Sequence, residues 1–167
     1  MTPAELLIDA FARIAEGARD VVDGLDEDEL AHRPGPEANP IGWLVWHLAR
    51  VQDDHVAEVA GLEQVWTAKG FAERSDLPFD DGEIGYGHSS QQVAEVRLDA
   101  RLLGEYVAAV HEQTVGYLEG VSADDLDRVV DERWDPPVTL GVRLMSVVND
   151  DAQHLGQAAY VRGLLPD

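Results

Sequence analysis

The chain has 167 residues, of which 45% are hydrophobic, so it is long enough for one globular core and too apolar to be disordered. Its 33 acidic and 12 basic side chains give a formal net charge of −21, which argues against nucleic acid or an anionic membrane surface as the main partner. Cysteine is absent, which excludes disulfides, thiolate metal sites and cysteine nucleophiles, so any thiol chemistry needs a thiol from outside the chain.

No apolar run approaches the length of a membrane span, and the first residues lack the basic and apolar regions of a secretion signal. We therefore expect a cytoplasmic protein that binds neither membrane nor nucleic acid. The length fits one domain over residues 1–167.

Two amphipathic segments open the chain. Residues 3–24 form the first predicted helix, which Thr2 caps and whose apolar positions recur in steps of four and three. The second predicted helix spans residues 40–60, with Asn39 as its cap and Pro40 at its first position. Its first half is apolar nearly all round, which indicates that neighbours cover it on several sides.

A long segment without periodicity follows, from Gly61 to His88, with aromatic residues set among Gly, Asp and Pro. Segments of this kind often form a lid or a binding loop, but the aromatic residues favour a crossover that packs on the other helices. Ser89 then caps a third predicted helix over residues 90–120, whose apolar seam suits bundle packing.

The last predicted helix runs from Leu140 to Gly163, with Thr139 as its cap. Four long helices, no convincing strand pattern and a long crossover between the second and third helices predict an all-α four-helix bundle. A short internal repeat, residues 24–30 against residues 120–126, precedes two helices that carry candidate ligands. Similar halves would bring the second and fourth long helices together across a pseudo-twofold axis.

These two helices carry residues suited to metal binding. Asp150 and His154 are four residues apart and therefore share one helix face, about 5–6 Å apart at Cβ. His47, inside the apolar run of the second helix, is the candidate third ligand. Imidazoles and a carboxylate suit Zn²⁺ first, and also Ni²⁺, Fe²⁺ or Mn²⁺, and three protein ligands leave a coordination position open for chemistry.

Other interpretations of these residues stay open. A carboxylate followed by His at this spacing is also an ordinary helix contact, so His47 and His154 are alternatively hydrogen-bonded core residues without a metal. Gln157 is the candidate hydrogen-bond partner of a ligand, and Asp54 is the candidate base. Among the other histidines, His55 is an alternative ligand two turns after His47, although its polar neighbours favour a place near the surface. His88 fits the loop before the third helix better than a place facing the site, and no partner is visible for His32 and His111.

Three segments together resemble the DinB-like four-helix-bundle superfamily, and most closely its actinobacterial branch of mycothiol-dependent maleylpyruvate isomerase and mycothiol S-transferases. They are residues 39–48, 85–90 and 150–157, and the resemblance covers nearly the whole chain. It implies a bundle, often a homodimer, with a divalent metal held by His47 and His154. The remaining ligand position is histidine or glutamate in the family, and here Asp150 occupies it.

The resemblance implies a metal-dependent S-transferase that activates a low-molecular-weight thiol, mycothiol first, for attack on an electrophilic small molecule held beneath residues 61–88. The isomerase has a further C-terminal domain without a counterpart in this sequence, which favours the S-transferase. Arg50 and Arg162 are candidates for binding the thiol's carboxylate, although solvated helix arginines are the simpler interpretation. The alternative function is a non-catalytic, metal-binding stress protein or dimeric scaffold.

Overall fold

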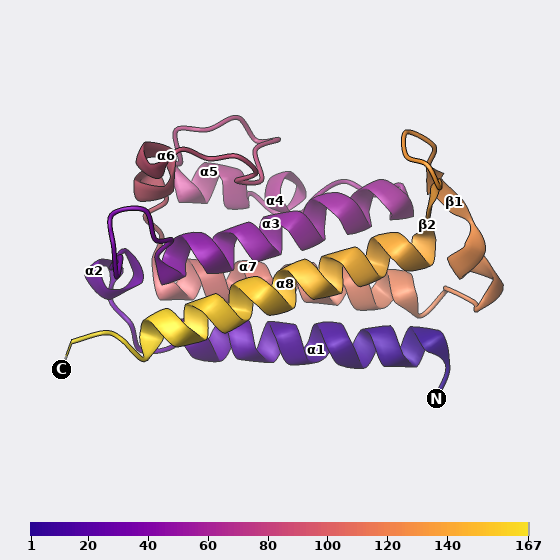
Figure 1. Cartoon of the computed structure of the whole chain (residues 1–167), viewed down its shortest axis with the longest axis horizontal. Helices are drawn as coiled ribbons and strands as arrows, with labels where there is room; N and C mark the ends of the chain where they lie inside the picture. Colours follow the sequence, from indigo (N-terminus) through magenta and orange to yellow (C-terminus); the bar gives the residue numbers. More distant parts are fainter. Residues whose placement is uncertain (167) are drawn as a thin grey trace.

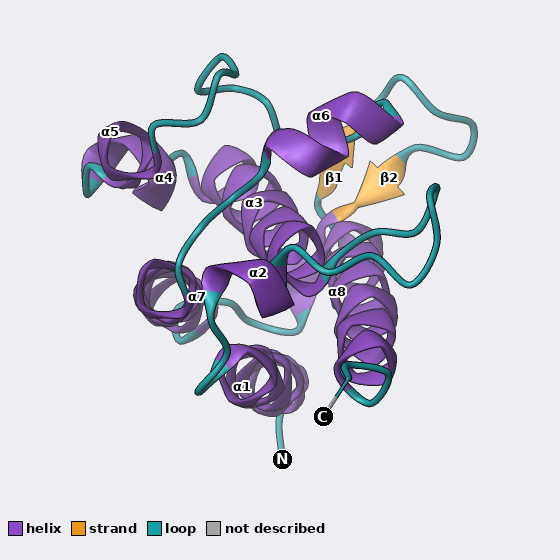
Figure 2. Cartoon of the chain, turned by 90° about the vertical axis from the view of Figure 1, so that its left-hand side faces the viewer, coloured by secondary structure: helices purple, strands orange, loops and turns teal. Residues whose placement is uncertain are grey.

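The computed structural model describes residues 1–166 and consists of four long helices packed as a bundle (Figure 1). The long helices are α1 (Pro3–Val22), α3 (Ile41–Ala60), α7 (Ala100–Leu118) and α8 (Leu140–Arg162). Around the bundle, α1 packs on α7, α7 on α3, α3 on α8, and α8 on α1 (Figure 2). The predicted fold class is confirmed, and the two helices with candidate ligands are neighbours.

Short elements connect the long helices. They are α2 (Glu27–Leu30), α4 (Val65–Ala68), α5 (Phe71–Ser75), α6 (Ser90–Glu95), the 3-10 helix η1 (Asp124–Asp127) and the strands β1 (Val129–Asp131) and β2 (Val138–Thr139). The two strands pair antiparallel, with Val129 opposite Thr139, and precede α8. The sequence pattern does not predict this hairpin, because strands of two and three residues are too short to show a period.

Most predicted helix caps are present. Thr2 and Glu5 form the capping box of α1, and the side chain of Thr139 accepts a hydrogen bond at the start of α8. The cap of α3 was predicted wrongly: Pro40 occupies the cap position without a side-chain hydrogen bond, and Asn39 lies before it. The rigid φ of proline therefore starts this helix without a capping side chain.

The third predicted helix is divided in two. The chain leaves helical geometry at Val96, with φ −78° and ψ 88°, and α7 begins only after Asp99, whose side chain accepts a hydrogen bond from the Leu102 amide. Val96 and Leu98 are buried, so apolar side chains face the core through the break as well. The apolar pattern in the sequence is therefore continuous although the helix is not. The single helix over residues 90–120 was therefore wrong.

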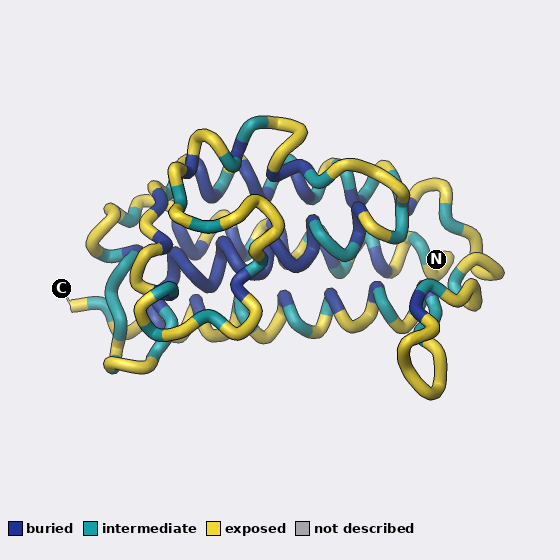
Figure 3. Tube along the Cα trace, turned by 90° about the horizontal axis from the view of Figure 1, so that it is seen from above, coloured by how far each residue is buried: buried dark blue, intermediate teal, exposed yellow. Residues whose placement is uncertain are grey.

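The crossover over residues 61–88 packs on the bundle through the short helices α4 and α5, which lie against α3 and α7 (Figure 1). Trp66 and Phe71 are buried within it. Beneath it, every residue from Ile41 to Asp53 is buried, so α3 is the most enclosed of the long helices (Figure 3). None of the helices within residues 1–166 has the length and apolar character needed to cross a membrane.

Candidate metal centre

The seam between α3 and α8 brings three potential ligands together. His47 from α3, and Asp150 and His154 from α8, each place one ligand atom within 4.8 Å of the others. The two imidazole rings meet edge to face with 4.7 Å between their centroids, and His154 Nδ1 lies 3.3 Å from Asp150 Oδ2. The structure thus gathers the three residues that the sequence analysis selected.

Backbone carbonyls fix the protonated nitrogen of both imidazoles. His47 Nδ1 hydrogen-bonds to the carbonyl of Ile84, and His154 Nδ1 lies 2.9 Å from the carbonyl of Asp150. Because a carbonyl oxygen only accepts, each Nδ1 carries a proton, and Nε2 is the nitrogen that offers a lone pair when the imidazole is neutral. Metal-binding histidines have this arrangement, with one nitrogen held by a carbonyl and the other facing the ion.

The ionisation of His47 and Asp150 suits a cation, whereas the His154 imidazole holds its added proton more tightly than a free histidine. Burial lowers the pKa of His47, which is 6% exposed, so its imidazole is neutral near neutral pH. The contact with His154 lowers the pKa of the Asp150 carboxyl, and Asp150 in turn raises the pKa of His154. Asp150 Oδ2 is buried and lies 3.3 Å from His154 Nδ1, but that nitrogen makes its hydrogen bond to the Asp150 carbonyl, so the carboxylate oxygen accepts no hydrogen bond from residues 1–166 and is available to an ion.

These residues fit a divalent metal. Two imidazole nitrogens and one carboxylate oxygen are a donor set of catalytic Zn²⁺ sites, and three protein ligands leave coordination positions open. The side chains of His154 and Asp150 are 17% and 39% exposed. Solvent therefore reaches the group from the α8 side.

The opposite side of the group is closed by Trp43 and the crossover. The Trp43 ring stacks on His47, with 4.5 Å between centroids and 17° between planes. Gly85 adopts φ +91°, and a Cβ there would lie 2.8 Å from His47 Nδ1 and 2.9 Å from the Trp46 ring. This close approach requires glycine, and it seats the crossover directly on the imidazole.

The structure places the two candidate arginines outside the metal group. Arg50 is fully buried, so the expectation of a solvated side chain is wrong for it, and its donors are occupied by other acceptors. Arg162 donates to the carbonyls of Asp20 and Asp23 at the end of α1. Both arginines therefore make hydrogen bonds within the protein, Arg50 to the crossover and α7 and Arg162 to the end of α1.

The two other candidate residues also lie apart from the ligands. Asp54 Oδ1 accepts a hydrogen bond of 2.8 Å from Gln64 Nε2, and its other oxygen lies 3.7 Å from His55 Nδ1. Gln157 is exposed on α8 and has no side-chain hydrogen bond within the described residues. Gln157 was the candidate hydrogen-bond partner of a metal ligand, but its position on α8 faces solvent and not the ligands.

Two histidines outside the group are more enclosed than expected. His55 is partly buried, and its Nδ1 lies 3.2 Å from Arg143, which also pairs with Glu58 and Asp131. This network ties the β1–β2 hairpin to α3 and α8. The side chain of His88 is 2% exposed, and its Nδ1 accepts a hydrogen bond of 3.2 Å from Trp43 Nε1.

Sequence reasoning missed Ile84 and Asp151. Ile84 acts through its backbone, and a carbonyl contact leaves no signature in the residue type. Asp151 is 0% exposed, and neither of its carboxyl oxygens has a hydrogen-bond partner among residues 1–166. A signal for Asp151 exists, because it continues the buried stripe of Leu144 and Val147 at steps of three and four.

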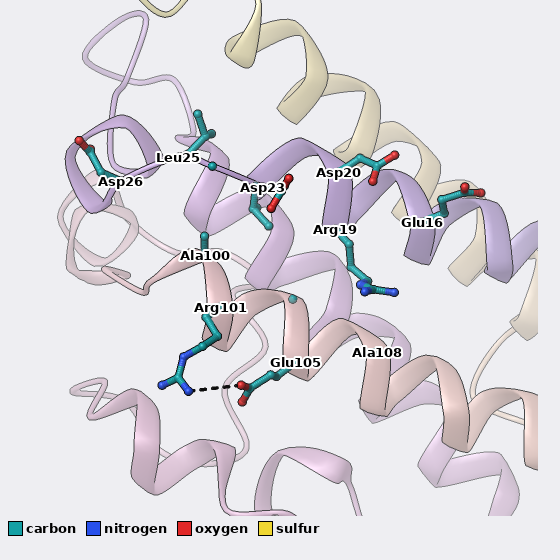
Figure 4. Close-up of a pocket in the computed structure, with 13 residues that line it drawn as sticks. Glu16, Arg19, Asp20, Asp23, Leu25, Asp26, Ala100, Arg101, Glu105 and Ala108 are labelled. Carbon is teal, nitrogen blue, oxygen red and sulfur yellow. Dashed lines mark ion pairs between the residues drawn. The ribbon is translucent and has the colours of Figure 1, made fainter.

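A wide groove of about 1020 Å³ lies elsewhere, between the second half of α1 and the first half of α7 (Figure 4). Acidic side chains dominate its lining, and Arg101 is paired with Glu105. The groove lies on the α1–α7 face, whereas the metal group lies between α3 and α8. The groove therefore contains none of the three candidate metal ligands.

A four-helix bundle with a His/Asp/His group between two of its helices is a DinB-like architecture. The chain matches the family described as mycothiol-S-transferase over residues 6–166, and it belongs to that family. It is also similar to the crystal structure of a conserved protein from Enterococcus faecalis, with a TM-score of 0.91 and 30% identity over 98% of this chain and 97% of that one. No curated protein matches the chain.

Proposed function

We propose that the protein is a metal-dependent S-transferase that joins a low-molecular-weight thiol, mycothiol first, to an electrophilic small molecule. Membership of the mycothiol-S-transferase family supports the transfer reaction, and the cluster of His47, Asp150 and His154 supports its dependence on a metal. The absence of cysteine agrees with this proposal, because the reacting sulfur then comes with the cosubstrate.

The residues prepare the site for this chemistry. A divalent ion held by the three side chains would lower the pKa of a bound thiol, so that the thiol reacts as a thiolate near neutral pH. His47 and His154 present lone pairs in fixed directions, and the Asp150 carboxylate offsets positive charge. The thiol proton would pass to solvent, the thiolate sulfur would bond to the electrophilic carbon, and the leaving group would depart with the electron pair of the broken bond.

Access to the site determines where the substrates bind. Ile84 and Gly85 lie directly on His47, which leaves no space for a substrate between the crossover and that imidazole. We therefore place the thiol and the electrophile at the edge of α8 that carries Asp150 and His154, which are partly exposed, beside the outward face of that helix. This differs from the expectation that the electrophile lies beneath residues 61–88.

The test is thiol-dependent consumption of an electrophile such as a bimane reagent or a chlorinated dinitrobenzene. We expect the metal-loaded parent to consume it faster than the uncatalysed reaction with mycothiol, with glutathione as the comparison thiol, and His154→Ala to lose this activity. A metal-loaded parent that accelerates neither reaction would favour the non-catalytic metal-binding scaffold.

We further propose that the homodimer implied by the DinB-like resemblance forms through the outward face of α8. Every exposed residue of this helix is uncharged, in a chain of net charge −21, so a second copy meets no like charge there. These residues are Val142, Met145, Ser146, Asn149, Ala152, Gln153, Gly156, Gln157, Ala159 and Tyr160. In an antiparallel pair centred between Ala152 and Gln153, Met145 lies opposite Tyr160 and Asn149 opposite Gly156.

We expect the parent to be a dimer and Met145→Glu to be a monomer, because each copy of the variant buries an unpaired carboxylate opposite Tyr160 of the second copy. Molar mass by light scattering during size-exclusion chromatography measures this. Leu6→Glu, at an equally exposed apolar position on α1, should leave the dimer intact. A parent that is monomeric at tens of micromolar, or a dimeric Met145→Glu, would reject this interface.

A further inference from the structure

Arg50 is a fully buried basic residue beside the candidate metal centre. It follows His47 by three residues on α3 and is 0% exposed. Its Nε donates to the carbonyl of Glu83 at 3.1 Å, and its Nη2 donates to the carbonyl of Asp81 at 2.8 Å. One guanidinium therefore holds two carbonyls of the crossover against α3, in the forked geometry that only arginine supplies.

The remaining nitrogen of the same guanidinium, Nη1, contacts Gln64 of the crossover and two residues of the long helices. Arg50 Nη1 donates to Gln64 Oε1 at 2.8 Å and to the Tyr106 hydroxyl at 3.3 Å, and it lies 3.6 Å from the carboxylate of Asp53. Asp53 is also buried, and it accepts a hydrogen bond of 2.9 Å from Tyr106. The Arg50 guanidinium is thus connected to α7 as well as to α3.

Asp53 extends this network into the crossover itself. Its two carboxylate oxygens accept hydrogen bonds of 2.8 Å from the amides of Val65 and Trp66, at the start of α4. Arg50 lies over the Trp66 ring, 5.0 Å from its centroid. Both the beginning of the crossover and its later part are therefore fastened to one buried ion pair.

The part of the crossover next to the metal group has no helix or strand to hold it. Residues 80–88 lack regular secondary structure, and Ile84 follows directly after the two carbonyls that Arg50 binds. The Ile84 carbonyl is the acceptor of His47 Nδ1, and Gly85 lies against the same ring. A small displacement of Asp81 or Glu83 would therefore move the group that fixes the His47 tautomer.

We propose that Arg50 is a positioning residue of the metal centre: it holds residues 81–83 against α3, so that the Ile84 carbonyl keeps the proton of His47 on Nδ1 and directs Nε2 to the ion. The proposal rests on the proposed function for its metal. The effect of Arg50 on the His47 tautomer can be measured in the metal-free protein. The positioning role and the proposed function can therefore fail separately.

Arg50→Lys is the first test, since lysine keeps the charge beside Asp53 but cannot bind both carbonyls in a fork. We expect the Kd for Zn²⁺, measured by competition with a chromophoric chelator, to rise about 10- to 100-fold, the loss typical of groups that orient a metal ligand. In the metal-free protein, nitrogen-15 NMR of the histidine rings should show His47 losing its predominant Nδ1–H tautomer.

Arg162→Lys is the matched control. Arg162 also donates to two backbone carbonyls, those of Asp20 and Asp23, but at the far end of α8. We expect this variant to lower Tm while it leaves the Kd for Zn²⁺ and the His47 tautomer unchanged. The comparison separates positioning of the centre from general stabilisation of the fold.

Tyr106→Phe covers the case in which Arg50→Lys does not fold. It removes one hydroxyl that touches both Arg50 and Asp53, and we expect a several-fold rise in the Kd for Zn²⁺ with the same direction of tautomer change. A lower Tm with an unchanged tautomer and Kd in either folded variant would make the Arg50 network purely structural. A parent without metal affinity but with the tautomer change would overturn the proposed function and retain the positioning role.

Discussion

We expect His47→Ala and His154→Ala each to weaken binding of Zn²⁺ by about 100- to 1000-fold. Structural zinc sites with four ligands are worth about 10–16 kcal/mol, so one ligand accounts for about 2.5–4 kcal/mol. The two imidazoles come from different helices and both keep a free Nε2, so neither replaces the other. Metal content by mass spectrometry and chelator competition, on protein without a purification tag, measure the loss.

Asp150 provides a graded series at the same site. Asp150→Asn removes the negative charge at nearly constant size, so we expect a large loss of affinity, whereas Asp150→Glu keeps the ligand type and should retain metal. His111→Ala is the control, because His111 is a half-buried histidine on α7 outside the metal group. If both His47→Ala and His154→Ala keep near-stoichiometric metal, the ion binds elsewhere, and these histidines are core residues of the bundle.

The ligand set was accessible to sequence reasoning because it depends on helix geometry. A spacing of four residues places Asp150 and His154 on one face whatever the rest of the fold does. That His47 faces them follows from the pairing of α3 with α8, which the short repeat and the resemblance suggest. These are statements about helices, whose period is visible in a single sequence.

The contacts of Trp43 and the crossover with His47 could not be predicted from the sequence in the same way. The contact from Ile84 to His47 joins residues 37 apart through a backbone carbonyl, in a segment without a period. Arg50 receives its partners from the same segment, so its position on a nearly all-apolar helix face is the only sequence sign that it is buried. Which acceptors compensate a buried charge is decided by tertiary structure.

The remaining large effect concerns Asp151. We expect Asp151→Leu to raise the free energy of unfolding of the metal-free protein by about 1–3 kcal/mol, the cost of burying a polar group without a hydrogen bond. Leucine has the same branching at Cγ, and it suits a position on the buried stripe of α8. Thermal unfolding followed by circular dichroism should show a rise in Tm of about 2–12 °C, whereas Asp20→Leu on the exposed face of α1 should change little.

The pH dependence of the free energy of unfolding shows whether the Asp151 carboxyl causes the loss of stability. Burial raises the pKa of Asp151 well above its usual value, with a further contribution from Asp150. The folded protein therefore holds this proton more tightly than the unfolded chain, and the parent loses stability as pH rises through the folded pKa. The advantage of Asp151→Leu should grow over that range and then level off.

Asp151→Asn, which cannot ionise, should remove the same pH dependence without added volume. A variant that keeps the parent's pH profile would assign that dependence to another group. A carboxyl that destabilises the core one residue from a candidate ligand is the kind of local conflict that proteins retain at functional sites.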